Sequence, residues 1–307
     1  MASMKNKSDK SSKKAETAAL SKQGDRALAK PKRILTIHDL EQGLLKLFPA
    51  DTAEAWDRTG LLVGEGGLPA ERICIALDPT VETIRMAASV GASVLITHHP
   101  AYLEAPDKFA PEDSVALATG ANVWEAIRSK VALMCFHTAL DVSRQAQTVL
   151  PNMLGIQPRG KVVEPLSGSS SKGYGQICSV AKGKGKKIAL SELSARCVSV
   201  FGRMPRVWGS PDKELATVVT CTGSAGGTGK AALAAGADAL ICGEIKYHEA
   251  LALSDAGMAI IELGHDTSEF PLTAVLAQAC VQVGINEQSI VILDQPNTWY
   301  TPEAIRL

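Results

Sequence analysis

The chain has 307 residues, of which 46% are hydrophobic, so it can build a substantial core, and disorder along most of its length is excluded. Its 32 basic residues equal its 32 acidic residues, which gives the whole molecule no charge bias toward nucleic acid or an anionic membrane. The seven cysteines occur singly, and no run of about 18 apolar residues is present. We therefore expect a cytoplasmic protein with reduced cysteines and no membrane span.

The first 33 residues differ from the rest in charge. They contain eight Lys and two Arg against three acidic residues, a net charge of +7, which leaves −7 for the remainder. They also lack apolar periodicity, so they predict a flexible basic tail, with a solvated arm favoured over a targeting or nucleic-acid role. Thr36 and Asp39 then form an N-cap pattern, which predicts a first helix that ends before Pro49.

From Arg72 onward, short apolar runs alternate with helical stretches. Such near-continuous apolar strands, separated by helices, predict a buried parallel sheet covered on both faces. In the first half, the pattern predicts strands at 73–77, 92–97 and 131–136, and helices at 81–90 and 115–130.

The second half repeats this scheme. It predicts strands at 217–222, 237–242, 258–263 and 289–293, and helices at 230–235, 247–256 and 269–283. Residues 151–186, rich in Gly, Ser and Lys, are interpreted as a connection with one strand at 176–181. A faint echo between 87–99 and 231–244, aligned at Gly91 and Gly236, indicates two similar halves. We expect an α/β fold with mainly parallel sheets and two lobes, over 34–150 and 151–307.

Histidine is the most informative residue type. Four of the six histidines stand at or just beyond the end of a predicted strand, and the crevice outside those ends is where open parallel sheets bind ligands. The adjacent pair His98-His99 precedes Pro100, so the two rings can point to different sides of one crevice, an arrangement that suits two metal ions better than one. The other two of the four are His137 and His265.

Two carboxylates accompany these histidines. Asp141 follows His137 past one strand end, and Glu269 lies four residues after His265, on the same face of a predicted helix start. Imidazole and carboxylate donors together suit Zn, Mn, Fe or similar divalent ions. A single histidine after a strand is more often a loop residue than a ligand, but three recurrences of one location weaken that alternative. His248 is interpreted as a wall or supporting residue of the site, and His38 as an ordinary residue of the first helix.

A Gly-rich turn at 222–227 joins a predicted strand to a helix. Its free backbone N–H groups could hold a phosphate, with Gly223 and Gly226 as candidates, but the turn matches neither the P-loop nor a clean dinucleotide-binding pattern. A plain tight turn and an anion cradle both remain open.

Six ordered motifs give the chain a specific resemblance. From about Thr36 to about Tyr300 it resembles the Nif-three-like family of dinuclear-metal proteins, also called GTP cyclohydrolase I type 2 homologues. The motifs are Trp56-Asp57-Arg58-Thr59-Gly60-Leu61-Leu62-Val63-Gly64, Ile96-Thr97-His98-His99-Pro100, His137-Thr138-Ala139-Leu140-Asp141, Thr222-Gly223-Ser224-Ala225-Gly226, Gly243-Glu244-Ile245-Lys246-Tyr247-His248, and Gly264-His265 through Glu269.

The resemblance implies a site and an assembly. Two divalent metal ions would lie in the crevice between two α/β lobes, with His137 as a supporting residue or occasional ligand. The assembly would be a toroidal homohexamer, a trimer of dimers, without an inserted middle domain. The implied ligands are His98, His99, Asp141, His265 and Glu269.

Such a site favours hydrolysis, because two metals with open positions can activate water and clamp both oxygens of a displacement. Asp141 or Glu269 would bridge the ions, and the substrate would be nucleotide-like or a phosphoester, with the cyclohydrolase activity implied by resemblance alone. The alternative is a non-enzymatic metal-binding regulatory or protein-interaction ring. The predicted substrate contacts are Glu244, Lys246, His248, Gly223 and Gly226.

Overall fold

The computed structural model describes residues 34–111, 119–180, 186–295 and Trp299. The tail predicted over 1–33 lies outside the described residues, as do positions 115–118 of the helix predicted at 115–130. The described residues from Leu35 onward belong to one compact unit.

The first sheet has five strands and is parallel apart from one edge. β1 (Gly60–Val63) pairs antiparallel with β4 (Ala132–Cys135), and the remaining neighbours are parallel. Across the sheet the order continues through β3 (Val94–Thr97) and β2 (Ile73–Ala76) to β13 (Ile290–Ile292). The four residues of β2, of β3 and of β4 are all buried, as expected for parallel strands covered on both faces.

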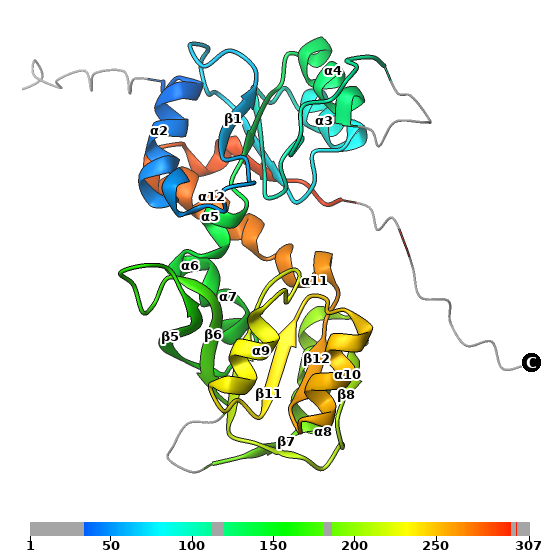
Figure 1. Cartoon of the computed structure of the whole chain (residues 1–307). Coiled ribbons are helices and arrows are strands. Elements are labelled where there is room, and N and C mark those ends of the chain that lie inside the picture. Colours follow the sequence, from blue (N-terminus) through cyan, green and yellow to red (C-terminus); the bar gives the residue numbers. More distant parts are fainter. Residues whose placement is uncertain (1–33, 112–118, 181–185, 296–298, 300–307) are drawn as a thin grey trace, which may run out of the picture. The chain divides into compact units, whose positions relative to one another are not determined.

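Alternating side chains of these strands enter two separate cores. Ile73 and Ile75 of β2 pack with α2 (Ile37–Leu47) and α12 (Leu272–Val283) on one face. Cys74 of the same strand packs with α3 (Val81–Ser89) and α4 (Thr119–Ser129) on the other, where these two helices lie side by side (Figure 1). The predicted start of α2 is confirmed, since Thr36 and Asp39 form a reciprocal capping box.

The second sheet has a parallel centre with antiparallel edges. β10 (Thr217–Thr220), β11 (Ala239–Cys242) and β12 (Ala259–Glu262) are parallel. β6 (Gly173–Ser179) joins β10 antiparallel and β5 (Gln157–Pro165) joins β6, while β8 (Arg206–Trp208) closes the other edge.

Helices cover both faces of this sheet too. One core contains residues of α7 (Val149–Met153) and α8 (Leu190–Phe201). The other contains residues of α9 (Thr228–Ala234) and α10 (Tyr247–Asp255), which lie over β11 and β12 in Figure 1. The short remaining elements are η1 (Ala50–Thr52), α5 (Thr138–Asp141), α6 (Arg144–Gln147), β7 (Ile188–Ala189), β9 (Glu214–Leu215), α11 (His265–Glu269) and η2 (Glu287–Ser289).

The two halves share a local motif that the sequence echo indicated. Gly91 after α3 and Gly236 after α9 both have a φ of +73°, which favours glycine. The amide of each glycine donates to the carbonyl three residues earlier, at Ala88 and at Leu233. Each turn leads directly into a central strand, β3 or β11.

Three sequence predictions need correction. Residues 151–186 are more than a connection with one strand, because β5 and β6 form a hairpin that extends the second sheet. The helix predicted at 269–283 begins later, at Leu272, as α12, because proline is best accommodated at a helix start, whereas Glu269 ends the short preceding helix α11. Finally, β13 pairs with β2 and so belongs to the first sheet. The prediction had placed this strand in the second lobe, over 151–307.

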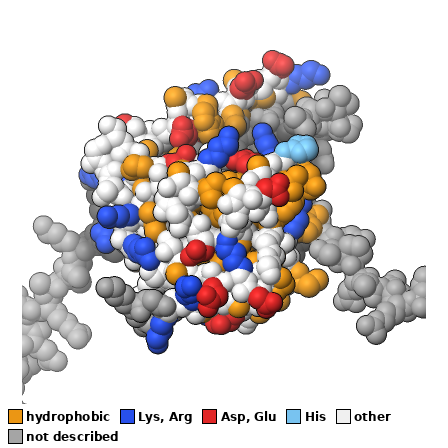
Figure 2. Space-filling model, turned by 60° about the horizontal axis from the view of Figure 1, so that its bottom comes forward, with side chains coloured by type: hydrophobic (Ala, Val, Ile, Leu, Met, Phe, Trp, Pro, Cys, Tyr) orange, Lys and Arg blue, Asp and Glu red, His pale blue; other side chains and the backbone are white. Residues whose placement is uncertain are grey.

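The surface and the cysteines agree with the composition. All seven cysteines are buried and unpaired, as predicted for small core residues. Figure 2 shows acidic and basic side chains interspersed with hydrophobic ones on the face that it displays. In the part of the chain that the structure describes, no helix is both long and apolar enough to span a membrane.

Candidate metal centre

The candidate donors stand after the carboxyl ends of strands from both sheets. His98 and His99 follow β3, Asp141 ends the short helix α5 that comes after β4, and His265 begins α11 after β12. Glu269 is the last residue of α11, one helical turn beyond His265. These side chains thus lie where parallel sheets are expected to carry their ligand-binding residues, beyond the carboxyl ends of the strands.

One set of donors is deeply buried. His98 has no exposed surface, and its Nε2 atom lies 3.5 Å from Asp141 Oδ1 and 3.5 Å from Glu269 Oε1. One donor atom from each of these three residues falls within 4.8 Å of the others. This inner group is His98, Asp141 and Glu269.

A second set is more open. The Nε2 atoms of His99 and His265 each lie 3.0 Å from Glu269 Oε2, and the three donors again fall within 4.8 Å of one another. The His99 side chain is 23% exposed and the His265 side chain 36%, so this outer group reaches solvent. Glu269 belongs to both groups and turns one carboxylate oxygen toward each.

The second nitrogen of each imidazole is held by an oxygen outside these groups. His98 Nδ1 lies 3.1 Å from the Phe136 carbonyl, and His99 Nδ1 lies 2.7 Å from Asp78 Oδ1. His265 Nδ1 lies 3.1 Å from Glu244 Oε1. Because carbonyl and carboxylate oxygens accept hydrogen bonds, each Nδ1 donates a hydrogen bond. Each Nε2 is then left available as a ligand atom for a metal, which is the usual arrangement of histidines in metal sites.

His137 completes the cluster of rings. Its centroid lies 5.2 Å from that of His98 and 5.5 Å from that of His99. His98, His99 and His137 form a third group of donor atoms within 4.8 Å. His137 Nδ1 lies 3.0 Å from Asp57 Oδ1, in the segment before β1.

The electrostatics of the cluster favour positive charge. Burial lowers the pKa of His99, but Asp78 and Glu269 outweigh it and raise that pKa to about 10. The nearby Glu269 carboxylate raises the pKa of His265 to about 9. Burial alone would raise the pKa of Glu269, yet His98 and the other imidazoles lower it well below its usual range. The carboxylates therefore stabilise a cation at this position.

Buried polar atoms without partners show that the residues present suit a metal. Among the described residues, His98 Nε2 and Glu269 Oε2 are buried and make no hydrogen bond, although ion-pair distances separate them from charged neighbours. An unsatisfied buried polar atom costs about 1–3 kcal/mol. A divalent cation bound by nitrogen and oxygen donors would satisfy both atoms, so these groups could hold a metal ion.

The Gly-rich turn packs beneath the cluster. Gly223 donates its amide to Ser268 Oγ, and Ala225 donates to the Glu244 carbonyl. At the start of α9, Thr228 Oγ1 donates to the carboxylate of Glu164 at 2.5 Å. The amides of Gly223 and Ala225 therefore already have protein partners, and anion binding by Gly223 and Gly226 stays a prediction.

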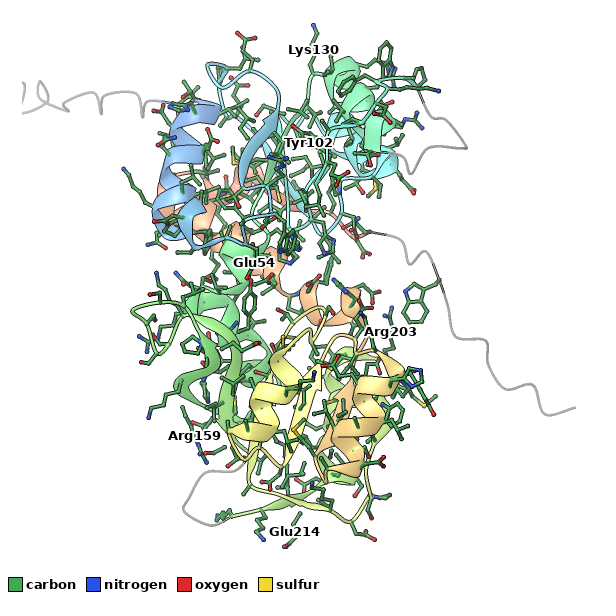
Figure 3. The ribbon with its side chains drawn as sticks, viewed as in Figure 1. Glu54, Tyr102, Lys130, Arg159, Arg203 and Glu214 are labelled. Carbon is green, nitrogen blue, oxygen red and sulfur yellow. The ribbon has the colours of Figure 1, made fainter. Side chains whose placement is uncertain are left out.

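The other predicted substrate contacts lie in different surroundings. Glu244, His99 and His265 line a cavity of about 380 Å³ that Trp299 also borders. Lys246 and His248 are exposed at the start of α10 and do not line that cavity. A larger cavity of about 790 Å³ shares Leu77, Asp78 and Asp266 with the first. Its lining also includes Phe270 and Arg203, and Arg203 is labelled in Figure 3.

Two residues that contact the histidines were not predicted from the sequence. Asp78 follows β2, so the rule of polar residues after strand ends could have found it. Asp57 lies in the Trp56-Asp57 motif, but its contact with His137 depends on long-range folding and has no local signal.

Comparison with known proteins places the chain among its relatives. The family model Duf34/NIF3 (NGG1p interacting factor 3) matches residues 35–296. A protein of Streptomyces coelicolor named GTP cyclohydrolase 1 type 2 homolog is 30% identical over 236 residues, covering 73% of this chain and 78% of the relative.

Solved structures share the fold. A hypothetical protein of Staphylococcus aureus superposes with a TM-score of 0.77 at 20% identity, covering 88% of this chain and 100% of that one. A Bacillus cereus protein related to NIF3 superposes with a TM-score of 0.73 at 17% identity, covering 90% and 100%. With its two α/β sheets, its cluster of histidines and the family match over nearly all described residues, the chain belongs to the Duf34/NIF3 family.

Proposed function

We propose that this protein is a metal-dependent hydrolase with two divalent ions, acting on a nucleotide-like or phosphoester substrate. The observation that carries the proposal is the position of Glu269. Its Oε1 faces His98 in the inner group, and its Oε2 faces His99 and His265 in the outer group. A carboxylate that faces two sets of donors in this way is suited to bridge two cations.

The residues of the two groups would have separate roles. His98 and Asp141 would hold the inner ion, with Asp141 a second candidate for the bridge, and His99 and His265 would hold the outer one. Two bound metals supply Lewis acidity and an activated water for in-line displacement. Asp78 and Glu244 orient the outer imidazoles, and the solvent access of His99 and His265 directs a substrate to the outer side.

The cavities beside the outer group support a substrate of moderate size. The cavity of about 380 Å³ contains His99 and His265, and the neighbouring cavity of about 790 Å³ adds apolar walls such as Phe201 and Phe270. Mixed apolar and polar walls are typical of small-molecule sites. The name of the Streptomyces relative, GTP cyclohydrolase 1 type 2 homolog, favours a purine nucleotide within this class. Glu244, Lys246 and His248 remain candidates for substrate contact.

A direct assay tests the enzyme hypothesis. The metal content of purified protein is measured, and nucleotides and phosphoesters are then screened with added Mn²⁺ or Zn²⁺. We expect turnover that is lost in Glu269→Gln and His98→Ala and kept in His38→Ala, a matched control because His38 is exposed on α2, far along the chain from the ligands. Metal binding without any turnover above these variants would favour the non-enzymatic regulatory ring instead.

We also propose a homohexamer, a trimer of dimers, and a cytoplasmic location. The family resemblance supports the assembly, and several large apolar side chains are exposed, among them Ile127 at 62% and Met204 at 80%. Light scattering of the full chain measures the assembly, and a mass of one or two copies would contradict it. Fractionation of cells tests the location.

A further inference from the structure

The segment Trp56-Asp57 has no role in the proposed function, yet its carboxylate is deeply enclosed beside the cluster. The Asp57 side chain has no exposed surface. It accepts from the Thr138 amide at 2.9 Å and from the Thr138 hydroxyl, both on Oδ2. Its other oxygen, Oδ1, lies 3.0 Å from His137 Nδ1 and also accepts from the Arg58 amide at 2.7 Å.

These contacts determine which nitrogen of His137 carries a proton. An ionised carboxylate can only accept, so Nδ1 must donate to Asp57, and Nε2 of a neutral ring is then left with its lone pair. The indole of Trp56 packs against the same ring at a centroid distance of 5.8 Å, in an edge-on arrangement. The ring is therefore held by a hydrogen bond and by an aromatic contact from neighbouring residues.

The remaining nitrogen of His137 is the one that is free to bind a metal. His137 offers a donor atom within 4.8 Å of donor atoms of His98 and His99, and its Nδ1 is occupied by Asp57. Among the described residues, the ion pair of His137 is with Asp57, whereas His98 lies 3.5 Å from both Asp141 and Glu269. His137 thus adds a nitrogen donor beside His98 and His99, and its own carboxylate partner is Asp57.

We infer that Asp57 is a positioning residue, which fixes His137 as an Nε2 donor to the metal centre. The inference rests on the proposed function, because it requires that the centre binds metal. It gives the Trp56-Asp57 segment a definite role, which is to select the tautomer of one imidazole.

A wider network keeps this carboxylate in place. Thr138 Oγ1, which donates to Asp57, also accepts from the Glu54 amide at 3.0 Å. The Glu54 carboxylate, labelled in Figure 3, accepts from the Tyr174 hydroxyl at 3.1 Å, and Tyr174 lies on β6 of the second sheet. Residues from the first sheet's loops and from the second sheet therefore share one set of hydrogen bonds around His137.

The substitution Asp57→Asn gives a sharp test. The Thr138 amide and hydroxyl both donate to Oδ2, whereas Oδ1 accepts from the exposed Arg58 amide and faces His137 Nδ1. Because the exposed Arg58 amide can be hydrated instead, we expect the single oxygen of asparagine to stay with the two Thr138 donors and its NH₂ group to face His137 Nδ1. An NH₂ donor requires Nδ1 to accept, which moves the ring proton to Nε2 and removes the lone pair from the metal side. The variant keeps the size of the side chain while it reverses the tautomer.

The experiment is a Co²⁺ titration of the metal-free full chain, followed by visible absorption, for Asp57→Asn, His137→Ala and the double variant. We expect each single variant to bind Co²⁺ about 10- to 100-fold more weakly with an altered ligand-field spectrum. The double variant should lose no more affinity than His137→Ala alone. Glu125→Gln is the matched control, because Glu125 is also a buried carboxylate, and its hydrogen bonds among the described residues are with Arg85, Arg128 and Ser129.

The outcomes distinguish failure of the proposed function from failure of this inference. Wild-type protein that binds no Co²⁺ would overturn both the proposed function and this inference. If the wild type binds Co²⁺ and His137→Ala binds it with the same affinity and spectrum, the inference alone is overturned. It is also overturned if the loss of Co²⁺ affinity caused by Asp57→Asn persists when His137 is absent. If Asp57→Asn does not fold, it is replaced by Thr138→Val, which removes one hydrogen-bond donor from the same carboxylate. A smaller loss of Co²⁺ affinity in this variant supports the inference, and an unchanged affinity contradicts it.

Discussion

Gly223 packs directly against the carboxylate of Glu269. A Cβ atom at position 223 would lie 2.1 Å from Glu269 Oε1, far inside van der Waals contact, and Gly223 has a φ of +60°. Gly226, in the same turn, has a φ of +47° but nothing within 4 Å of its Cβ position. Gly223 is therefore required by the close approach of Glu269, whereas Gly226 is required only by its backbone conformation.

This contrast predicts different effects of two alanine substitutions. Both variants should lose about 1–2 kcal/mol of unfolding free energy, the cost of placing a Cβ in the left-handed region. Only Gly223→Ala should also weaken metal binding, because the added methyl group displaces Glu269. Calorimetric titration with Mn²⁺ checks this, and equal metal affinity in the two variants would contradict the position assigned to Glu269.

Removal of the Glu269 charge should affect both proposed metal positions at once. Glu269→Gln keeps the size of the side chain but leaves one neutral oxygen where two charged ones faced His98 and His99. We expect the metal content per chain, measured by elemental analysis, to fall from two ions to one or none. Asp141→Asn, which changes only the inner group, should spare the outer ion. A Glu269→Gln protein with its full metal content would be incompatible with a bridging carboxylate.

Metal removal should lower the stability of the fold. The cluster packs imidazoles and carboxylates whose buried atoms His98 Nε2 and Glu269 Oε2 have no hydrogen-bond partner among the described residues. A ligand that binds only the folded state at 100 times its dissociation constant contributes about 2.7 kcal/mol. Thermal unfolding with and without a chelator should therefore show a lower Tm for the chelated protein, and readdition of Zn²⁺ or Mn²⁺ should restore it. An unchanged Tm would argue against a metal in this cluster.

Glu125 gives a pH prediction that is independent of the metal centre. Burial raises its pKa, but Arg128, Ser129 and Arg85 outweigh burial and hold that pKa below its ordinary value of 4.5. A carboxyl with a lowered pKa contributes stability above its unfolded pKa and loses it as the pH falls through the folded one. Since both arginines are more than half exposed, we expect Glu125→Gln to cost about 1–2 kcal/mol near pH 7. Urea unfolding should show that the difference shrinks as the pH falls below the unfolded pKa; a constant difference down to acid pH would contradict this cause.

Much of the fold could be predicted because its signals are local. The capping box of Thr36 and Asp39, the glycine stops at Gly91 and Gly236, and the continuous apolar strands all act within a few residues. The pairing of β13 with β2 could not be predicted in this way, because the strand carries no local signal for its partner. The hairpin of β5 and β6 was hidden for another reason, since its Gly- and Ser-rich sequence has the composition of a loop.

The candidate site could be predicted in type better than in detail. Strand ends explain why His98, His99 and His265 lie near one another, and helical spacing explains why Glu269 faces His265. Of the supporting carboxylates, Asp78 follows a strand end and could have been found by the same rule, whereas the contact of Asp57 with His137 depends on the assembled fold. Glu244, which was predicted to contact substrate, lies 3.1 Å from His265 Nδ1 and has a positioning contact as well.

The proposed position of Glu269 between two metal ions is tested most directly by an anomalous difference map from crystals grown with Mn²⁺ or Zn²⁺. We predict two peaks, one beside Oε1 and shared with His98 and Asp141, the other beside Oε2 and shared with His99 and His265. A map with no peak within bonding distance of Glu269, or with a single peak held by other residues, would contradict this position.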